Sequence, residues 1–119
     1  MTAEAFSPYG IDYEDALDRF GGNLDLYRRL AGKYAANEHF IGMDAALEAG
    51  DWDQAYREAH ALKGVAGNLS FSRLYDLASQ ICHALREGSP ETAMRLLPDA
   101  RDAHEKARAA ARAFQEGQL

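Results

Sequence analysis

Apolar residues recur at three- and four-residue spacing along most of the chain, a period that predicts amphipathic helices and no strands. Polar residues that favour helix starts precede these stretches, and glycines follow several of them. The predicted helices cover residues 13–20, 24–36, 40–49, 52–68, about 72–87 and 90–114. We therefore expect an all-α fold, an up-down-up-down four-helix bundle with one or more short N-terminal helices.

Details of the helix ends follow from individual residues. The predicted N-caps are Asp12, Asn23, Asp51, either Ser70 or Ser72, and Ser89. Asn37 leaves open whether residues 24–49 form one bent helix or two, because asparagine competes for backbone hydrogen bonds. Pro98 lies inside the last predicted helix and should kink it or move its start downstream.

The helix predicted at 52–68 has two unlike faces. Its core face consists of small and aliphatic residues, Ala55, Ala59, Leu62, Ala66 and Leu69. On the other side, Lys63, Gly64 and Gly67 fall within roughly 60° of His60 on a helix of 3.6 residues per turn. Each glycine costs the helix up to about 1 kcal/mol relative to alanine. Such a cost predicts a function for the exposed side, where His60 has a cation beside it and little crowding.

Length and composition limit the class of protein. A chain of 119 residues is expected to be a single domain, residues 1–119, with its helical core at about 11–115. The lone Cys82 excludes an internal disulfide and is expected in the core. Because no apolar run is long enough to span a bilayer and no signal peptide is evident, we expect a cytoplasmic protein. A net charge of −6 without a basic cluster argues against nucleic-acid binding.

Several catalytic and metal-binding arrangements are missing from the sequence. None of the four histidines lies three or four residues from another, so a metal site has little support. No nucleophile elbow or phosphate-binding loop is present, which argues against hydrolase and kinase activity. We expect His39 and His104 on solvated faces. His83 lies in a similar string, but its Gly88 is off the same face and is explained as a helix end.

Residues 59–69, AHALKGVAGNL, resemble the H-x-x-K-G-x-x-G signature of histidine-containing phosphotransfer (Hpt) domains. Segments at 10–12, 20–27 and 49–52 are also similar to bacterial members, so that the resemblance covers roughly residues 10–115. Many members carry a third glycine ten residues after the histidine, where this chain has Ser70, and we expect the loop to differ there. Similar domains occur as free-standing carriers and as the last module of hybrid kinases.

The resemblance implies a function for this site. In the family, the exposed Nε2 of the histidine, here His60, accepts a phosphoryl group from the phospho-aspartate of one receiver domain and passes it to another. Lys63 would neutralise the phosphoryl oxygens, and Gly64 and Gly67 would leave room for the receiver. The expected partners are response-regulator receivers or a hybrid sensor histidine kinase, with no nucleic acid and no membrane. The chain itself would need no cofactor or metal, since the receiver brings Mg²⁺.

Two other classes of function stay open at this point. The chain could be an interaction module that docks a receiver or kinase without being phosphorylated, although His60 with Lys63 argues against it. It could also be a cofactor-binding bundle. Whether the chain is a phosphocarrier or a docking module, we expect further contacts with the partner from residues near the surface of His60, namely Tyr56, Arg57 and Asn68.

Overall fold

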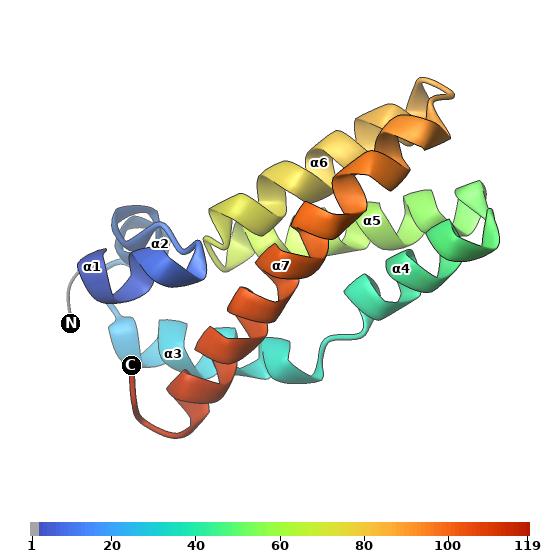
Figure 1. Ribbon diagram of the computed structural model, residues 1–119. Helices are drawn as coiled ribbons and strands as arrows, with labels where there is room; N and C mark the ends of the chain where they lie inside the picture. The colour runs from blue at the N-terminus through green and yellow to red at the C-terminus, as the bar shows by residue number, and fades with distance from the viewer. Residues whose placement is uncertain (1–2) are drawn as a thin grey trace.

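The computed structural model describes residues 3–119, and every regular element in that part of the chain is helical (Figure 1). The elements are α1 Ala3–Phe6, the 3₁₀ turn η1 Ser7–Tyr9, α2 Tyr13–Arg19, α3 Leu24–Gly32, the 3₁₀ turn η2 Lys33–Ala36, α4 His39–Ala49, α5 Trp52–Asn68, α6 Ser72–Arg86 and α7 Pro90–Gln115. No helix among the described residues is long and apolar enough to cross a membrane.

The four helices α4 to α7 form a bundle. Each packs against the next one along the chain, and α7 returns to contact α4, which closes the bundle (Figure 1). The connections between them are short, so neighbouring helices run antiparallel. The prediction of an all-α bundle with short helices on its N-terminal side is thus confirmed.

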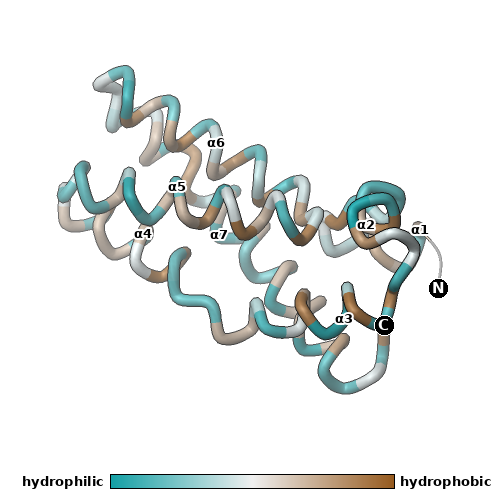
Figure 2. The backbone as a smooth tube through the Cα atoms, turned by 180° about the vertical axis from the view of Figure 1, so that it is seen from behind, coloured by the Kyte–Doolittle hydropathy of each residue, from teal (hydrophilic) through white to brown (hydrophobic). Residues whose placement is uncertain are grey.

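The C-terminal half of α7 extends beyond the bundle and holds the N-terminal part of the chain. Helix α3 and the turns η1 and η2 pack against it, and Figure 2 shows α1, α2 and α3 gathered at the same end of the molecule as the C-terminus. Three aromatic rings join these segments, since Phe6 lies within 6.2 Å of both Tyr27 and Phe114, measured between ring centroids. The N-terminal segment is therefore part of the packed fold.

Local sequence determines where most helices begin. The side chains of Asp12, Asn23 and Asp51 each accept a hydrogen bond from the backbone N–H three residues on, as predicted for N-caps. Ser89 occupies the predicted cap position of α7 without a side-chain bond. The prediction for α6 was wrong, because its N-cap is Phe71, which has no capping side chain.

The two open points of the sequence pattern are resolved by the backbone. Residues 24–49 form two helices, because Asn37 is extended (φ −73°, ψ 133°) and its side chain accepts a hydrogen bond from His39 N–H at 3.0 Å. Helix α7 starts at Pro90 and continues through Pro98 without interruption. Pro98 therefore does not move the start of the helix downstream.

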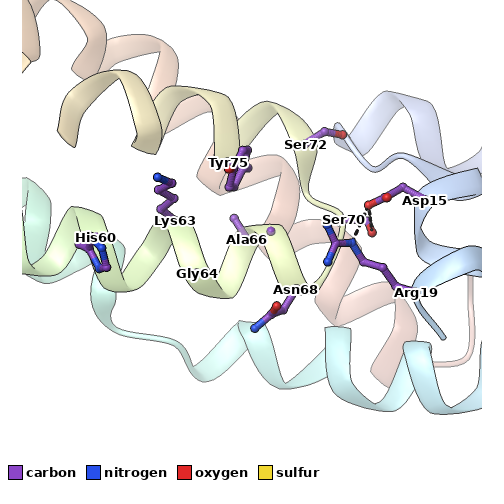
Figure 3. Close-up of a pocket in the computed structure, with 11 residues that line it drawn as sticks. Asp15, Arg19, His60, Lys63, Gly64, Ala66, Asn68, Ser70, Ser72 and Tyr75 are labelled. Carbon is purple, nitrogen blue, oxygen red and sulfur yellow. Dashed lines mark hydrogen bonds and ion pairs between the residues drawn. The ribbon is translucent and has the colours of Figure 1, made fainter. Parts of the chain in front are cut away.

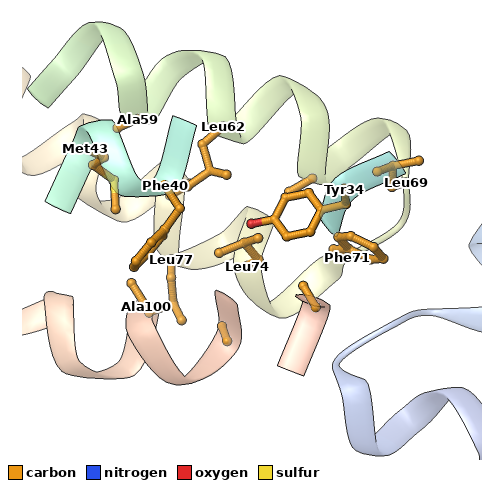
Figure 4. Close-up of a cluster of buried hydrophobic side chains, with 14 of the residues drawn as sticks. Tyr34, Phe40, Met43, Ala59, Leu62, Leu69, Phe71, Leu74, Leu77 and Ala100 are labelled. Carbon is orange, nitrogen blue, oxygen red and sulfur yellow. The ribbon is translucent and has the colours of Figure 1, made fainter. Parts of the chain in front are cut away.

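The core is built around the small-residue face of α5 (Figure 4). Its predicted members are all buried, namely Ala55, Ala59, Leu62, Ala66 and Leu69. Alanine side chains allow the neighbouring α4 and α6 to approach closely, and larger residues such as Phe40, Met43 and Leu74 fill the space between the helices. Cys82 is buried too, as predicted.

His104 was predicted on a solvated face, and that prediction was wrong. Its side chain is only 4% exposed and lies inside the bundle. The Nδ1 atom is 2.7 Å from the Tyr34 hydroxyl, and the ring stacks on Phe40 with centroids 4.1 Å apart. Burial lowers the pKa of His104, so the ring stays neutral near pH 7. His39, by contrast, is partly exposed, with Nδ1 3.4 Å from the Glu58 carboxylate.

The turn between α5 and α6 is the point where the N-terminal segment meets the bundle. Ser70 has φ +57°, a left-handed conformation that glycine adopts more readily. Its hydroxyl donates to Asp15 at 2.7 Å, and its carbonyl accepts from Asp12 N–H at 3.0 Å. The Tyr27 hydroxyl donates to the Leu69 carbonyl at 2.6 Å. These bonds fix α2 and α3 beside the end of α5 that carries the two glycines.

Candidate functional site

Helix α5 presents His60 on its solvent side. Asp51 caps the helix and sets its first turn, and the buried alanine face fixes which way it is rotated in the bundle. His60, one residue after the buried Ala59, is therefore directed away from the core and is exposed (Figure 3). An exposed neutral imidazole has a free nitrogen lone pair and can act as a nucleophile.

His60 lies in a shallow groove of about 520 Å³ that runs along α5 between α6 and α2 (Figure 3). The same groove is lined by four residues predicted from the sequence, Lys63, Gly64, Gly67 and Asn68. The rest of its lining comes from α2, α6, the turn between α5 and α6, and α5 itself, namely Asp15, Arg19, Ser70, Ser72, Tyr75 and Ala66. The structure thus brings five of the residues predicted from sequence into one surface feature. It adds a wall from α2 that the sequence did not indicate.

The two glycines of the groove have different surroundings. A Cβ atom added at Gly64 would meet nothing within 4 Å, so the space beside it is open. A Cβ atom added at Gly67 would lie 3.1 Å and 3.2 Å from the Tyr75 ring. The notch at Gly67 is therefore occupied by a side chain of α6, whereas Gly64 leaves free access next to His60.

Positive charge borders the groove. Lys63 lies one turn after His60 and has its ammonium group 6.0 Å from the centre of the Tyr75 ring. Arg19 forms an ion pair with Asp15 at 2.8 Å, and this contact, with the Ser70 hydrogen bond, lowers the pKa of the Asp15 carboxyl. Because Asp15 offsets the charge of Arg19, the positive charge that can attract an anionic group beside the imidazole comes from Lys63, although the chain as a whole is acidic.

Tyr56 and Arg57 lie on the other side of His60, outside this groove. The Tyr56 and His60 ring centroids are 6.0 Å apart. Arg86 of α6 donates a short hydrogen bond to the Tyr56 hydroxyl, which raises the pKa of Arg86, and its guanidinium lies 5.6 Å from the Tyr56 ring centre. Arg57 is exposed and donates to Gln54 at 2.8 Å. The predicted docking residues therefore lie on both sides of His60 along α5, with Tyr56 and Arg57 before it and Gly64, Gly67 and Asn68 after it.

The sequence model of the Hpt domain family matches residues 35–110. The chain belongs to the Hpt domain family. The matched range contains α4, α5, α6 and most of α7, so the family match covers the bundle that carries His60. No curated protein and no solved structure matches the chain. Hpt domains act in histidine phosphotransfer within phosphorelays, as phosphocarriers that interact with receiver domains and not as enzymes.

Three other features of the described residues are candidates for a site, namely side chains that could ligate a metal, the Cys82 thiol and the exposed His83. Within residues 3–119 no three His, Cys, Asp or Glu side chains are grouped as metal ligands would be. Cys82 is buried, and that burial raises the pKa of its thiol although Lys63 and Arg86 oppose the effect. His83 is exposed on α6 and lines a separate hollow near the turn before α7. The hollow at His83 has neither a lysine nor a glycine in its lining, whereas the groove at His60 has Lys63, Gly64 and Gly67.

Among the residues near the site that sequence reasoning missed are Arg19, Tyr75 and Arg86. Tyr75 and Arg86 come from α6, and their positions depend on how that helix pairs with α5. Gly67 and Tyr75 lie equally far from Phe71 in the sequence, as do Tyr56 and Arg86, which is the relation expected in an antiparallel helical hairpin. A turn placed at Phe71 would have predicted both contacts. Arg19 had no comparable signal, because α2 precedes the hairpin.

Proposed function

We propose that His60 is the residue through which this Hpt domain carries phosphoryl groups between receiver domains. The lone pair of Nε2 forms a bond to the phosphorus of a receiver's aspartyl phosphate, the bond from phosphorus to the aspartyl oxygen breaks, and the carboxylate leaves with that electron pair. In the second step the carboxylate of another receiver attacks the phosphorus and the N–P bond breaks. The chain ends unchanged, as a carrier does.

The observation that carries this proposal is the open space beside an exposed imidazole. Phosphoryl transfer requires the attacking and leaving atoms to lie in line with phosphorus, so a bulky partner must approach the histidine closely. His60 is exposed, and nothing lies within 4 Å of the Cβ position of Gly64 one turn further on. On this proposal the missing side chain at Gly64 serves the receiver, since the fold gains no contact from it.

Charge neutralisation has local sources on the same proposal. Lys63 can direct its ammonium group to the phosphoryl oxygens, and Arg86 adds positive charge on the far side of Tyr56. The receiver supplies Mg²⁺, and the Hpt domain contributes no cofactor, nucleotide site or kinase activity of its own. Gly67, Tyr56, Arg57 and Asn68 belong to the surface that meets the receiver.

The test is transfer from a phosphorylated receiver domain to the purified chain. We expect an acid-labile label on the wild-type chain and no label on His60→Gln, because glutamine keeps roughly the size of the side chain but has no nucleophilic nitrogen. His83→Gln is the matched control, since His83 is also exposed on a helix of the bundle, and its label should equal that of the wild type.

Two results would overturn the assignment. Label retained in His60→Gln would place the phosphoryl group on another residue. A wild-type chain that binds the receiver but takes up no label would identify a docking module without phosphotransfer, the alternative left open by the sequence.

A further inference from the structure

We propose that Tyr75 is a positioning residue that keeps the Lys63 ammonium in the groove beside His60, and that Gly67 provides the notch in which Tyr75 is seated. This inference rests on the proposed function of His60 and Lys63. It assigns to Gly67 a role inside the domain, in addition to any contact with a receiver.

The first step concerns the Tyr75 ring. Tyr75 lies in the first turn of α6, and its backbone N–H donates to the Phe71 carbonyl at 2.8 Å. Its ring edge occupies the space where residue 67 of α5 would otherwise have a Cβ atom, at 3.1 Å and 3.2 Å from that position. Any side chain larger than that of glycine would displace the ring by some tenths of an ångström. Gly67 therefore determines how deeply Tyr75 enters the space between the two helices.

The second step concerns Lys63. Figure 3 shows its side chain extending from α5 toward α6, where Tyr75 projects back toward α5. The ammonium lies 6.0 Å from the ring centre, the outer limit of a cation–π contact. No carboxylate among residues 3–119 forms an ion pair with Lys63, so no ion pair competes with its contact to the tyrosine ring.

The consequence is a restricted lysine. A free lysine side chain samples many rotamers, and most of them direct the ammonium into solvent. Contact with Tyr75 favours the rotamers that keep the ammonium in the groove that also contains His60. Since Tyr75 is 37% exposed, the contact is weak, and we expect its loss to slow phosphotransfer about two- to fivefold.

A set of variants separates this role from a direct contact with the receiver. Tyr75→Phe keeps the ring and should transfer at nearly the wild-type rate, whereas Tyr75→Leu should be slower by the factor given above. In a Lys63→Ala background, Tyr75→Leu should have no further effect, because there is no ammonium left to position. Gly67→Ala, which displaces the ring, should likewise be slower with Lys63 present, and the part of this loss that comes from the ring should disappear when Lys63 is absent.

A second readout does not depend on transfer. In proton NMR, the ε-methylene signals of Lys63 should be shifted upfield by the Tyr75 ring in the wild type and in Tyr75→Phe, and this shift should be lost in Tyr75→Leu. Circular dichroism of each variant checks that the helical fold is kept.

The outcomes distinguish the two proposals. If Tyr75→Leu is as harmful without Lys63 as with it, or if the Lys63 signals show no ring shift, Tyr75 does not act through Lys63. A faster Tyr75→Leu would mean that the ring holds Lys63 away from His60, which also overturns the positioning role. The absence of any label on the wild-type chain would instead refute the proposed function itself.

Discussion

Replacing Gly64 by alanine is expected to stabilise the fold and to slow phosphotransfer at the same time. Glycine inside an exposed helix costs about 0.8–1.0 kcal/mol relative to alanine. The added methyl group meets nothing within 4 Å, so no steric term opposes this gain. With about 2.1 cal/mol/K of unfolding entropy per residue over 119 residues, the total is about 0.25 kcal/mol/K. The melting temperature should therefore rise by about 3–4 °C.

The same methyl group projects into the space beside His60 that the receiver needs. Transfer from a phosphorylated receiver should be slower in Gly64→Ala and slower by at least about tenfold in Gly64→Leu, a loss of about 1.4 kcal/mol of transition-state stabilisation. Thermal unfolding followed by circular dichroism and initial rates of label transfer measure the two effects. Gly67→Ala is the matched control for stability and should gain less, because the Tyr75 ring has to move.

Three results would contradict the role given to Gly64 and its surroundings. A Gly64→Leu chain that accepts label at the wild-type rate would show that the open space has no part in the transfer. A Gly64→Ala chain that melts at or below the wild-type temperature would show that the position is not an unobstructed site in a helix. Both glycines giving the same gain would contradict the different surroundings described for them.

Two further predictions concern stability. Burial lowers the folded-state pKa of His104, so the unfolded chain binds more protons than the folded one as the pH falls below about 6.5. The free energy of unfolding should therefore fall there by up to about 1.4 kcal/mol per pH unit. Urea midpoints at pH 5 and 7.5 should show a smaller fall in His104→Gln than in the wild type. Ser70→Gly should be more stable than Ser70→Ala by about 1 kcal/mol, since both variants lose the bond to Asp15 but only glycine adopts φ +57° freely. Equal urea midpoints for the two Ser70 variants would contradict that explanation.

Features that depend on a few neighbouring residues could be predicted from the sequence. Asp12, Asn23 and Asp51 each satisfy a backbone N–H only three residues away, so the cap and its helix appear in the same short stretch. The buried face of α5 was predictable for the same reason, because helical periodicity alone places its alanines on one side. His60, Lys63 and Gly64 share the opposite side by that geometry, and the structure brings them into one groove.

The prediction for His104 was wrong because it followed the usual exposure of histidine and not the position of this residue along the helix. Histidine is usually at least partly exposed, yet His104 lies four residues after Ala100 and three before Ala107, both of which are buried. The helical period therefore placed it inside the bundle. The hydroxyl that satisfies its ring belongs to Tyr34, far away in the sequence, and only the folded chain reveals that partner.

Which of the two glycines is covered by a neighbouring side chain depends on how α5 and α6 pair, and this pairing is seen only in the structure. Gly64 and Gly67 are about 60° apart on α5, and nothing in the motif says which of them α6 covers. The turn at Ser70 decides it, because a left-handed residue there folds α6 back so that Tyr75 meets Gly67 and leaves Gly64 open. A break between 68 and 72 was predicted, but serine is not the residue expected in a left-handed conformation, so the direction in which the turn sends α6 was not. One glycine thus admits a ring from the domain itself, while the other keeps free space next to His60.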